Sequence, residues 1–165
     1  VMYWFEISEN RRASFAAPGF PVFIWIFATG AEFGFYGFPT LDGETIKIAT
    51  ETFNAITDPD DVPHPVSMGE EQCMYKNYVQ GRLRGISDRC RSAASCLYTT
   101  TPDSDFVIGG HPDNDRVIIA SPCSGHGFKH SAAIGEVLAE QVIDGKSKID
   151  ISSFSLKRFK DHGEI

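Results

Sequence analysis

The chain has 165 residues, enough for about one domain with a hydrophobic core of its own. It carries 15 lysine and arginine residues against 22 aspartate and glutamate residues, a formal net charge of −7. This balance argues against a surface for nucleic acid or for an anionic membrane, because both need a basic face. The longest apolar run, over 20–28, is too short to span a membrane and is typical of a buried strand.

The cysteines have neither the spacing of zinc ligands nor the density of a disulfide scaffold; they are Cys73, Cys90, Cys96 and Cys123. We therefore expect free thiols in a reducing cytoplasm. No basic leader precedes an apolar run, as it would in a secretory signal peptide. The chain begins directly in strand-like sequence over 2–7, so we expect an amino-terminal part of a longer chain to precede it.

The first 57 residues are typical of an antiparallel sheet. Apolar and aromatic runs, separated by proline, glycine and other turn residues, predict three or four strands, over 2–7, 22–27, 33–38 and 45–50. A proline-broken acidic loop follows over 58–68. A helix is then expected over 70–80, ending at Gly81, and a basic, irregular segment over 82–91.

The second half predicts shorter strands and one strong helix. Strand candidates over 93–101 and 106–108 flank a turn, and the wholly apolar run over 117–120 is typical of a buried parallel strand. The helix follows, ends at Asp144-Gly145 and has apolar residues three or four positions apart, at Ile134, Val137, Leu138 and Val142. The predicted fold class is α+β: an antiparallel sheet, then a strand–Gly-loop–helix unit.

The Gly-x-Gly sequence between that strand and helix is the sharpest local feature. Free amides at the amino end of a helix, with the helix dipole behind them, favour anionic or electron-rich ligand groups. Gly125 and Gly127 would let such a ligand approach the backbone, and Lys129 adds a positive charge. His130 stands where the dinucleotide fingerprint has its third glycine, so a merely tight strand–helix turn is the other interpretation.

Other chemistries have weaker support. Ser124 beside His126 lacks the glycine two positions earlier that a hydrolase nucleophile needs, because Pro122 stands there. The acidic turns over 58–61 and 113–115 lack the glycine and final glutamate of a calcium loop, so no metal site is expected.

Two residues could have either a purely structural or a functional role. By composition alone, Cys96 would be a small buried hydrophobic residue. Lys47 alternates with Ile46 and Ile48 on a short strand, so it faces away from them. It is either a solvent-facing lysine or a half-buried ammonium in a site, where its charge would stabilise a developing anion.

Five blocks of sequence carry a family resemblance when taken together. They are Tyr36-Gly37-Phe38-Pro39, Ile46-Lys47-Ile48, Cys96-Leu97-Tyr98-Thr99, Pro102-Asp103-x-Asp105-Phe106-x-Ile108 and Ser124-Gly125-His126-Gly127-Phe128-Lys129. In order and spacing they resemble the carboxy-terminal half of the monomeric sarcosine oxidase and N-methyltryptophan oxidase family. The match extends over most of residues 30–159 and includes the closing Asp150-Ile151-x-x-Phe154-x-x-x-Arg158-Phe159.

The resemblance implies an FAD-dependent amine oxidase that oxidatively demethylates an N-methyl amino acid, such as sarcosine or N-methyltryptophan, and gives hydrogen peroxide from oxygen. It implies a covalent bond between FAD and Cys96, a role for Lys47 in the reaction with oxygen, and a place for Tyr36 in the amine pocket. Further expected flavin contacts are Tyr98, Gly125, His126, Gly127 and Phe128. Lys129 would bind the substrate carboxylate, and Glu51, where the family often has histidine, is counted with the substrate-binding residues.

The resemblance also implies that part of the site lies elsewhere. No Gly-x-Gly-x-x-Gly followed by an acidic residue about 20 positions later occurs in the chain, so an FAD-binding half is expected upstream. Residues 1–92 would belong to the substrate domain and residues 93–165 to the carboxy-terminal portion of the FAD-binding domain. The isolated chain would then be inactive. The alternative is a non-enzymatic binding or interaction module that keeps this fold without flavin.

Overall fold

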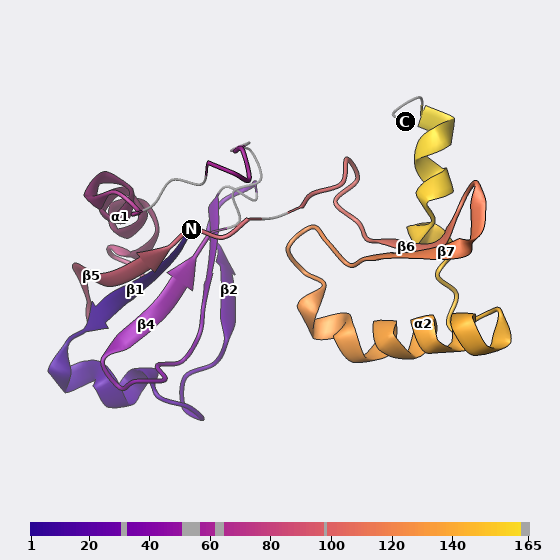
Figure 1. Ribbon diagram of the computed structural model, residues 1–165. Coiled ribbons are helices and arrows are strands. Elements are labelled where there is room, and N and C mark those ends of the chain that lie inside the picture. Colours follow the sequence, from indigo (N-terminus) through magenta and orange to yellow (C-terminus); the bar gives the residue numbers. More distant parts are fainter. Residues whose placement is uncertain (31–32, 51–56, 62–64, 98, 163–165) are drawn as a thin grey trace. The chain divides into compact units, whose positions relative to one another are not determined.

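The computed structural model describes residues 1–30, 33–50, 57–61, 65–97 and 99–162. The chain divides into two compact units, Val1–Leu97 and Tyr98–Ile165 (Figure 1). The division falls between 97 and 98, whereas the sequence suggested a boundary between 92 and 93. Each unit is described below by itself.

A five-stranded antiparallel sheet forms the first unit. Its order is β2 (Phe23–Ile26), β3 (Gly34–Gly37), β4 (Thr45–Ala49), β1 (Met2–Ile7) and β5 (Ile86–Ala94). The four predicted strands are confirmed, and a 3₁₀-helix, η1 (Glu9–Phe15), follows β1. At one edge of the sheet, β2 exposes Ile24 and Ile26 to solvent.

The fifth strand corrects two predictions. Residues 82–91 were expected to be irregular, but 86–91 belong to β5, which pairs with β1. The charges are accommodated because Glu6 on β1 forms ion pairs with Arg89 at 3.4 Å and with Arg91 at 3.0 Å. The strand predicted over 93–101 is wrong for residues 95–97 and 99–101, because β5 ends at Ala94.

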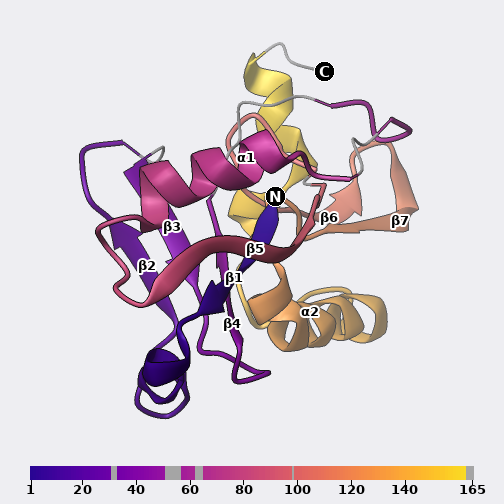
Figure 2. The same ribbon diagram turned by 90° about the vertical axis from the view of Figure 1, so that its left-hand side faces the viewer.

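One face of this sheet is covered by a helix. The helix begins as α1 (Met68–Met74), continues as a π-helical turn, η3 (Tyr75–Val79), and confirms the prediction over 70–80 (Figure 2). It starts two residues early because Ser67 and Glu70 form a reciprocal capping box. The buried core between the helix and the sheet consists of Tyr3, Phe5, Ile7, Phe15, Phe35, Ile46, Ile48, Met74, Val79 and Ile86.

The second unit is a hairpin with helical segments around it. Strands β6 (Val107–His111) and β7 (Asn114–Ser121) pair, and α2 (Ser131–Asp144) follows a 3₁₀-turn, η4 (Phe128–His130). Two more 3₁₀-helices, η5 (Ser152–Phe154) and η6 (Leu156–His162), complete the described chain. The α2 prediction is confirmed, including its end at Gly145, which has a left-handed φ of 73°. Together the two units confirm the α+β class.

The strand expected over 117–120 differs in kind from the prediction. It is part of β7, which runs antiparallel to β6, and Val117 and Ile118 remain partly exposed. The reason is the short connection after His111, which permits only a hairpin. In the part of the chain that the structure describes, no helix is long and apolar enough to cross a membrane.

The turn before β4 depends on one carboxylate. Asp42 accepts hydrogen bonds from the backbone amides of Glu44 (2.8 Å) and Thr45 (2.7 Å), and from the hydroxyls of Thr40 (3.0 Å) and Thr45 (2.6 Å). Burial raises the pKa of Asp42, but these hydrogen bonds outweigh it and lower the pKa below its usual range. The charged form of Asp42 therefore stabilises the folded turn.

We expect Asp42→Ala to reduce the free energy of unfolding by about 1–2 kcal/mol at neutral pH, because several donors lose their acceptor. Since the folded pKa is lowered, the difference from wild type should shrink as the pH falls below about 4, where the unfolded chain takes up the proton. Urea denaturation across this pH range measures both effects.

Asp58→Ala is the matched control, because the Asp58 carboxylate accepts one amide hydrogen bond, from Asp60 at 2.9 Å. Its effect should stay within about 0.5 kcal/mol. Equal losses of unfolding free energy in the two variants would contradict the stabilising role of the Asp42 carboxylate.

Candidate functional site

The sheet face opposite the helix carries the first group of candidate residues. Because side chains alternate along a strand, the burial of Ile46 and Ile48 under the helix places Lys47 on the other face, as predicted. The register sets Trp4 directly opposite Lys47, and Tyr36 opposite Ala49. The face opposite the helix thus brings Tyr36 and Lys47 into the same region.

Two aromatic rings flank the half-buried Lys47 side chain. Its Nζ lies 5.5 Å from the ring centroid of Trp4 and 5.3 Å from that of Phe38, both within cation–π range. Tyr36 meets Phe38 edge-on, with ring centroids 6.1 Å apart. Among the described residues no carboxylate forms an ion pair with Lys47.

Gly37 allows this arrangement. A Cβ there would lie 2.8 Å from the ring of Phe23 and 2.9 Å from the carbonyl oxygen of Lys47, so β3 could not approach β4 as it does. The flanking roles of Trp4 and Phe38 were not predicted. Trp4 is distant from Lys47 in sequence, and only the strand register shows that they meet.

Cys96 lies just beyond β5 and is exposed, which contradicts the interpretation as a buried hydrophobic residue. Its Sγ lies 3.9 Å from the carbonyl oxygen of Leu97. All four cysteines are free. Cys90 is partly buried, and this burial together with the nearby Glu71 raises the Cys90 pKa to about 11. Cys96 is thus an accessible thiol.

The glycine loop of the second unit turns sharply. Ser124 and Gly125 both have left-handed backbones, with φ of 61° and 78°. A Cβ at Gly127 would collide with the carbonyl oxygen of Pro122. The tight-turn interpretation therefore accounts for the glycine at 127, whether or not a ligand also approaches it.

The side chains around this loop differ in exposure. His126 stacks on Phe106 at 4.6 Å, and its Nε2 lies 3.1 Å from the carbonyl oxygen of Ser104. Phe128 is 95% exposed. Lys129 was expected in the first turn of the helix, but it lies in η4, the turn before α2, where its Nζ donates to the carbonyl of His126 at 3.0 Å.

The remaining candidates lie outside the described residues: Glu51 and Tyr98. Tyr36, Lys47 and Cys96 belong to the first unit, and the loop from Gly125 to Lys129 belongs to the second. Among the described residues, no group of three or more His, Cys, Asp or Glu side chains could hold a metal ion.

We expect Gly127→Ala to destabilise the second unit by about 1–3 kcal/mol, because Pro122 must move to admit the new methyl group. Amide hydrogen exchange of α2 and β7 measures the loss. Gly135→Ala is the control, since a Cβ at that helical position meets no atom within 4 Å. That variant should be neutral or up to about 1 kcal/mol more stable. Comparable destabilisation by both would contradict the steric explanation.

Comparison with known proteins gives the family. A family model described as "DAO: FAD dependent oxidoreductase" matches residues 4–141. The chain is 35% identical to the monomeric sarcosine oxidase of Arthrobacter sp. over 159 residues, which cover 96% of this chain and 40% of the relative. It is 34% identical to the N-methyl-L-tryptophan oxidase of Escherichia coli, over 97% of this chain and 41% of the relative.

A more distant relative is the human peroxisomal sarcosine oxidase, 27% identical over 99% of this chain and 42% of the relative. The chain thus spans about two fifths of the length of the curated relatives it matches. The family match covers most of the residues that form β1 to β7 and α2. The chain belongs to the DAO family of FAD-dependent oxidoreductases.

Proposed function

We propose that this chain is the carboxy-terminal part of an FAD-dependent oxidase that acts in the cytoplasm. Its substrate would be an N-methyl amino acid of the sarcosine or N-methyltryptophan type, and its products would include hydrogen peroxide. The observation that carries the proposal is the Lys47 ammonium between the rings of Trp4 and Phe38, in a chain similar along almost its whole length to oxidases named for these two substrates.

The residues present fit a flavin. Cys96 is an exposed thiol, which suits a thioether bond to the cofactor. Phe128 is an exposed aromatic ring beside a loop with two glycines, and an apolar ring of this kind suits contact with a flat cofactor. We assign Gly125, His126 and Gly127 to the same contact. When bound, FAD would supply a two-electron acceptor that oxygen can reoxidise.

Lys47 would supply a fixed positive charge where oxygen gains electrons. A preorganised ammonium stabilises a developing anion most when it needs no rearrangement, and the two flanking rings restrict the Lys47 side chain in this way. Tyr36 on the same face would line the amine pocket. Lys129 would bind the substrate carboxylate as a point charge, and Glu51 would complete the substrate-binding residues.

The two-part organisation follows from the same proposal. We assign the first unit, with its antiparallel sheet, to the substrate domain, and the second unit, with the β7–glycine-loop–α2 segment, to the FAD-binding domain. The boundary expected between 92 and 93 is thereby moved past the end of β5 at Ala94, to 97–98. The FAD-binding half that would complete the site lies in the remainder of a longer protein. The second candidate, a binding module without flavin, has no observation in its favour beyond the shared fold.

The test uses the longer protein that contains this chain, purified with its cofactor. Sarcosine and N-methyltryptophan should each be compared with glycine and tryptophan, which lack the methyl group. We expect oxygen uptake and peroxide release with at least one N-methyl substrate. A purified protein without flavin absorption would instead support the binding module.

The two lysines should serve different half-reactions of that protein. Methionine keeps the bulk of a lysine stem and removes its charge. We expect Lys47→Met to slow reoxidation of the reduced enzyme by about 10³-fold, which corresponds to ~4 kcal/mol. Lys129→Met should weaken the binding of substrates that carry a carboxylate and leave the rate of the oxygen reaction almost unchanged. Rapid-mixing kinetics separate the two steps, and equal losses of one step in both variants would contradict this division.

Cys96→Ser should release the flavin on acid precipitation, whereas wild type should retain it. Cys73→Ser is the matched control, because Cys73 is also an exposed thiol of the first unit. We expect the control to keep its flavin. Retention of covalent flavin by Cys96→Ser would refute the attachment site.

A further inference from the structure

The carboxy-terminal segment returns to the turn that precedes β6. Arg158, on η6, donates from Nε to Oδ2 of Asp103 at 2.6 Å and from Nη2 to Oδ1 at 3.1 Å. The Arg158 side chain is only 18% exposed, and its Nη1 donates to the carbonyl of Ser155 at 3.2 Å. A two-pronged pair of this kind fixes direction as well as distance.

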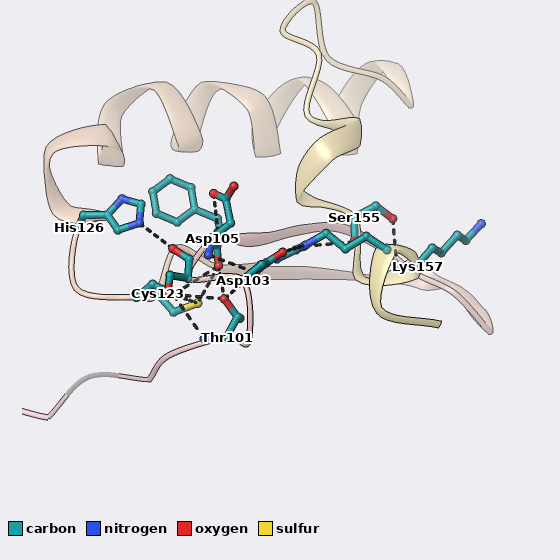
Figure 3. A network of polar contacts seen from close by, with 11 residues as sticks. Thr101, Asp103, Asp105, Cys123, His126, Ser155 and Lys157 are labelled. Carbon is teal, nitrogen blue, oxygen red and sulfur yellow. Dashed lines mark hydrogen bonds and ion pairs between the residues drawn. The ribbon is translucent and has the colours of Figure 1, made fainter. Parts of the chain in front are cut away.

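Asp103 also organises its own turn. Its Oδ1 lies 3.0 Å from the hydroxyl of Thr101 and accepts from the amide of Asp105 at 3.2 Å (Figure 3). These contacts hold the pKa of the Asp103 carboxyl well below its usual range. The largest contribution is the hydrogen bond from the Arg158 guanidinium, and the Asp105 amide and the Thr101 hydroxyl add smaller ones. Ser104, between Asp103 and Asp105, has a left-handed φ of 59°. A residue other than glycine keeps this conformation only where its surroundings impose it.

The same turn contacts the glycine loop at two points. The carbonyl of Ser104 accepts from Nε2 of His126 at 3.1 Å. The hydroxyl of Thr101 lies 3.3 Å from that of Ser124, which is 3% exposed, and the amide of Thr101 lies 3.4 Å from the same Ser124 oxygen. Ser124 and His126, which lie on either side of Gly125, are thus both held by the 101–105 turn.

We propose that Arg158 is a positioning residue for the glycine loop. By clamping Asp103 it fixes the 101–105 turn, and the turn fixes Ser124 and His126. The loop then presents Gly125 to Phe128 in one conformation. The effect on the loop is independent of the proposed function; only its consequence for flavin binding rests on that function. The competing explanation is that Arg158 merely anchors its own segment, 152–162.

Amide hydrogen exchange of the 165-residue chain distinguishes these explanations. In Arg158→Met we expect exchange at Ser124 and His130, whose amides donate to the carbonyls of Thr99 (2.7 Å) and Gly127 (2.9 Å), to become about tenfold faster, because local opening no longer has to break the clamp. Asp103→Asn should produce the same pattern. The double variant should add little, since each single change removes the same interaction.

Lys148→Met is the matched control. It removes an ion pair of 2.9 Å with Glu140 on α2, in the same unit, that does not contact the loop. Its loop exchange should equal that of wild type. Arg158→Lys keeps the charge without the two-pronged geometry, and it should fall between wild type and Arg158→Met; it also serves if Arg158→Met does not fold. Faster exchange confined to 152–162 would overturn the proposal.

The flavin consequence has a separate readout. In the longer protein carrying Cys96→Ser, so that the cofactor is not tethered, Arg158→Met should lower the flavin content and Lys148→Met should not. If the loop exchanges faster but the flavin content is unchanged, the positioning role of Arg158 stands and the assignment of the loop to flavin binding is refuted.

Discussion

The pairing of β1 with β4 decides what the first unit can do. Its register places Phe5 beside Ile46 on the helix-covered face and Trp4 beside Lys47 on the other. A slip of one residue would bury the ammonium and expose the isoleucines, and the cost of unpaired charge in a dry core excludes it. The apolar core on one side therefore fixes the charge on the other. Stability and chemistry in this unit depend on the same hydrogen-bonded pair of strands.

The second unit reaches its geometry by other means. Its hairpin is small, and polar contacts tie the 101–105 turn together and link it to His126 in the glycine loop. Left-handed backbones at Ser104 and Ser124 add strain that these contacts must offset. A loop held by hydrogen bonds has definite directions for its amides, which an apolar contact would not give. The proposed contact with a polar cofactor would need directions of this kind.

Alternation and turn residues were enough to predict β1 to β4, the helix over 68–79 and α2, because these elements follow local periodicity. The strand over 86–91 was missed because two of its charges, Arg89 and Arg91, pair with Glu6 on β1, and Arg91 lies 85 residues from Glu6 in the chain. The outward direction of Lys47 followed from local alternation, but its contacts with Trp4 needed the register. The pairing of Asp103 with Arg158 spans 55 residues, and no local pattern contains it. Local sequence patterns thus predicted most of the elements, whereas these long-range partners became visible only in the structure.

The exposed edge at β2 has a practical consequence for work on this chain. Beyond β3, the structure shows no further strand paired with β2 among the described residues, while Ile24 is 75% exposed and Ile26 is 64% exposed. Unpaired backbone groups next to exposed isoleucines form a template for another strand, including that of a second molecule. Concentrated samples of the chain would therefore favour intermolecular pairing along this edge. Charged replacements at the exposed Ile24 and Ile26 would discourage such association without touching the face that holds the buried core.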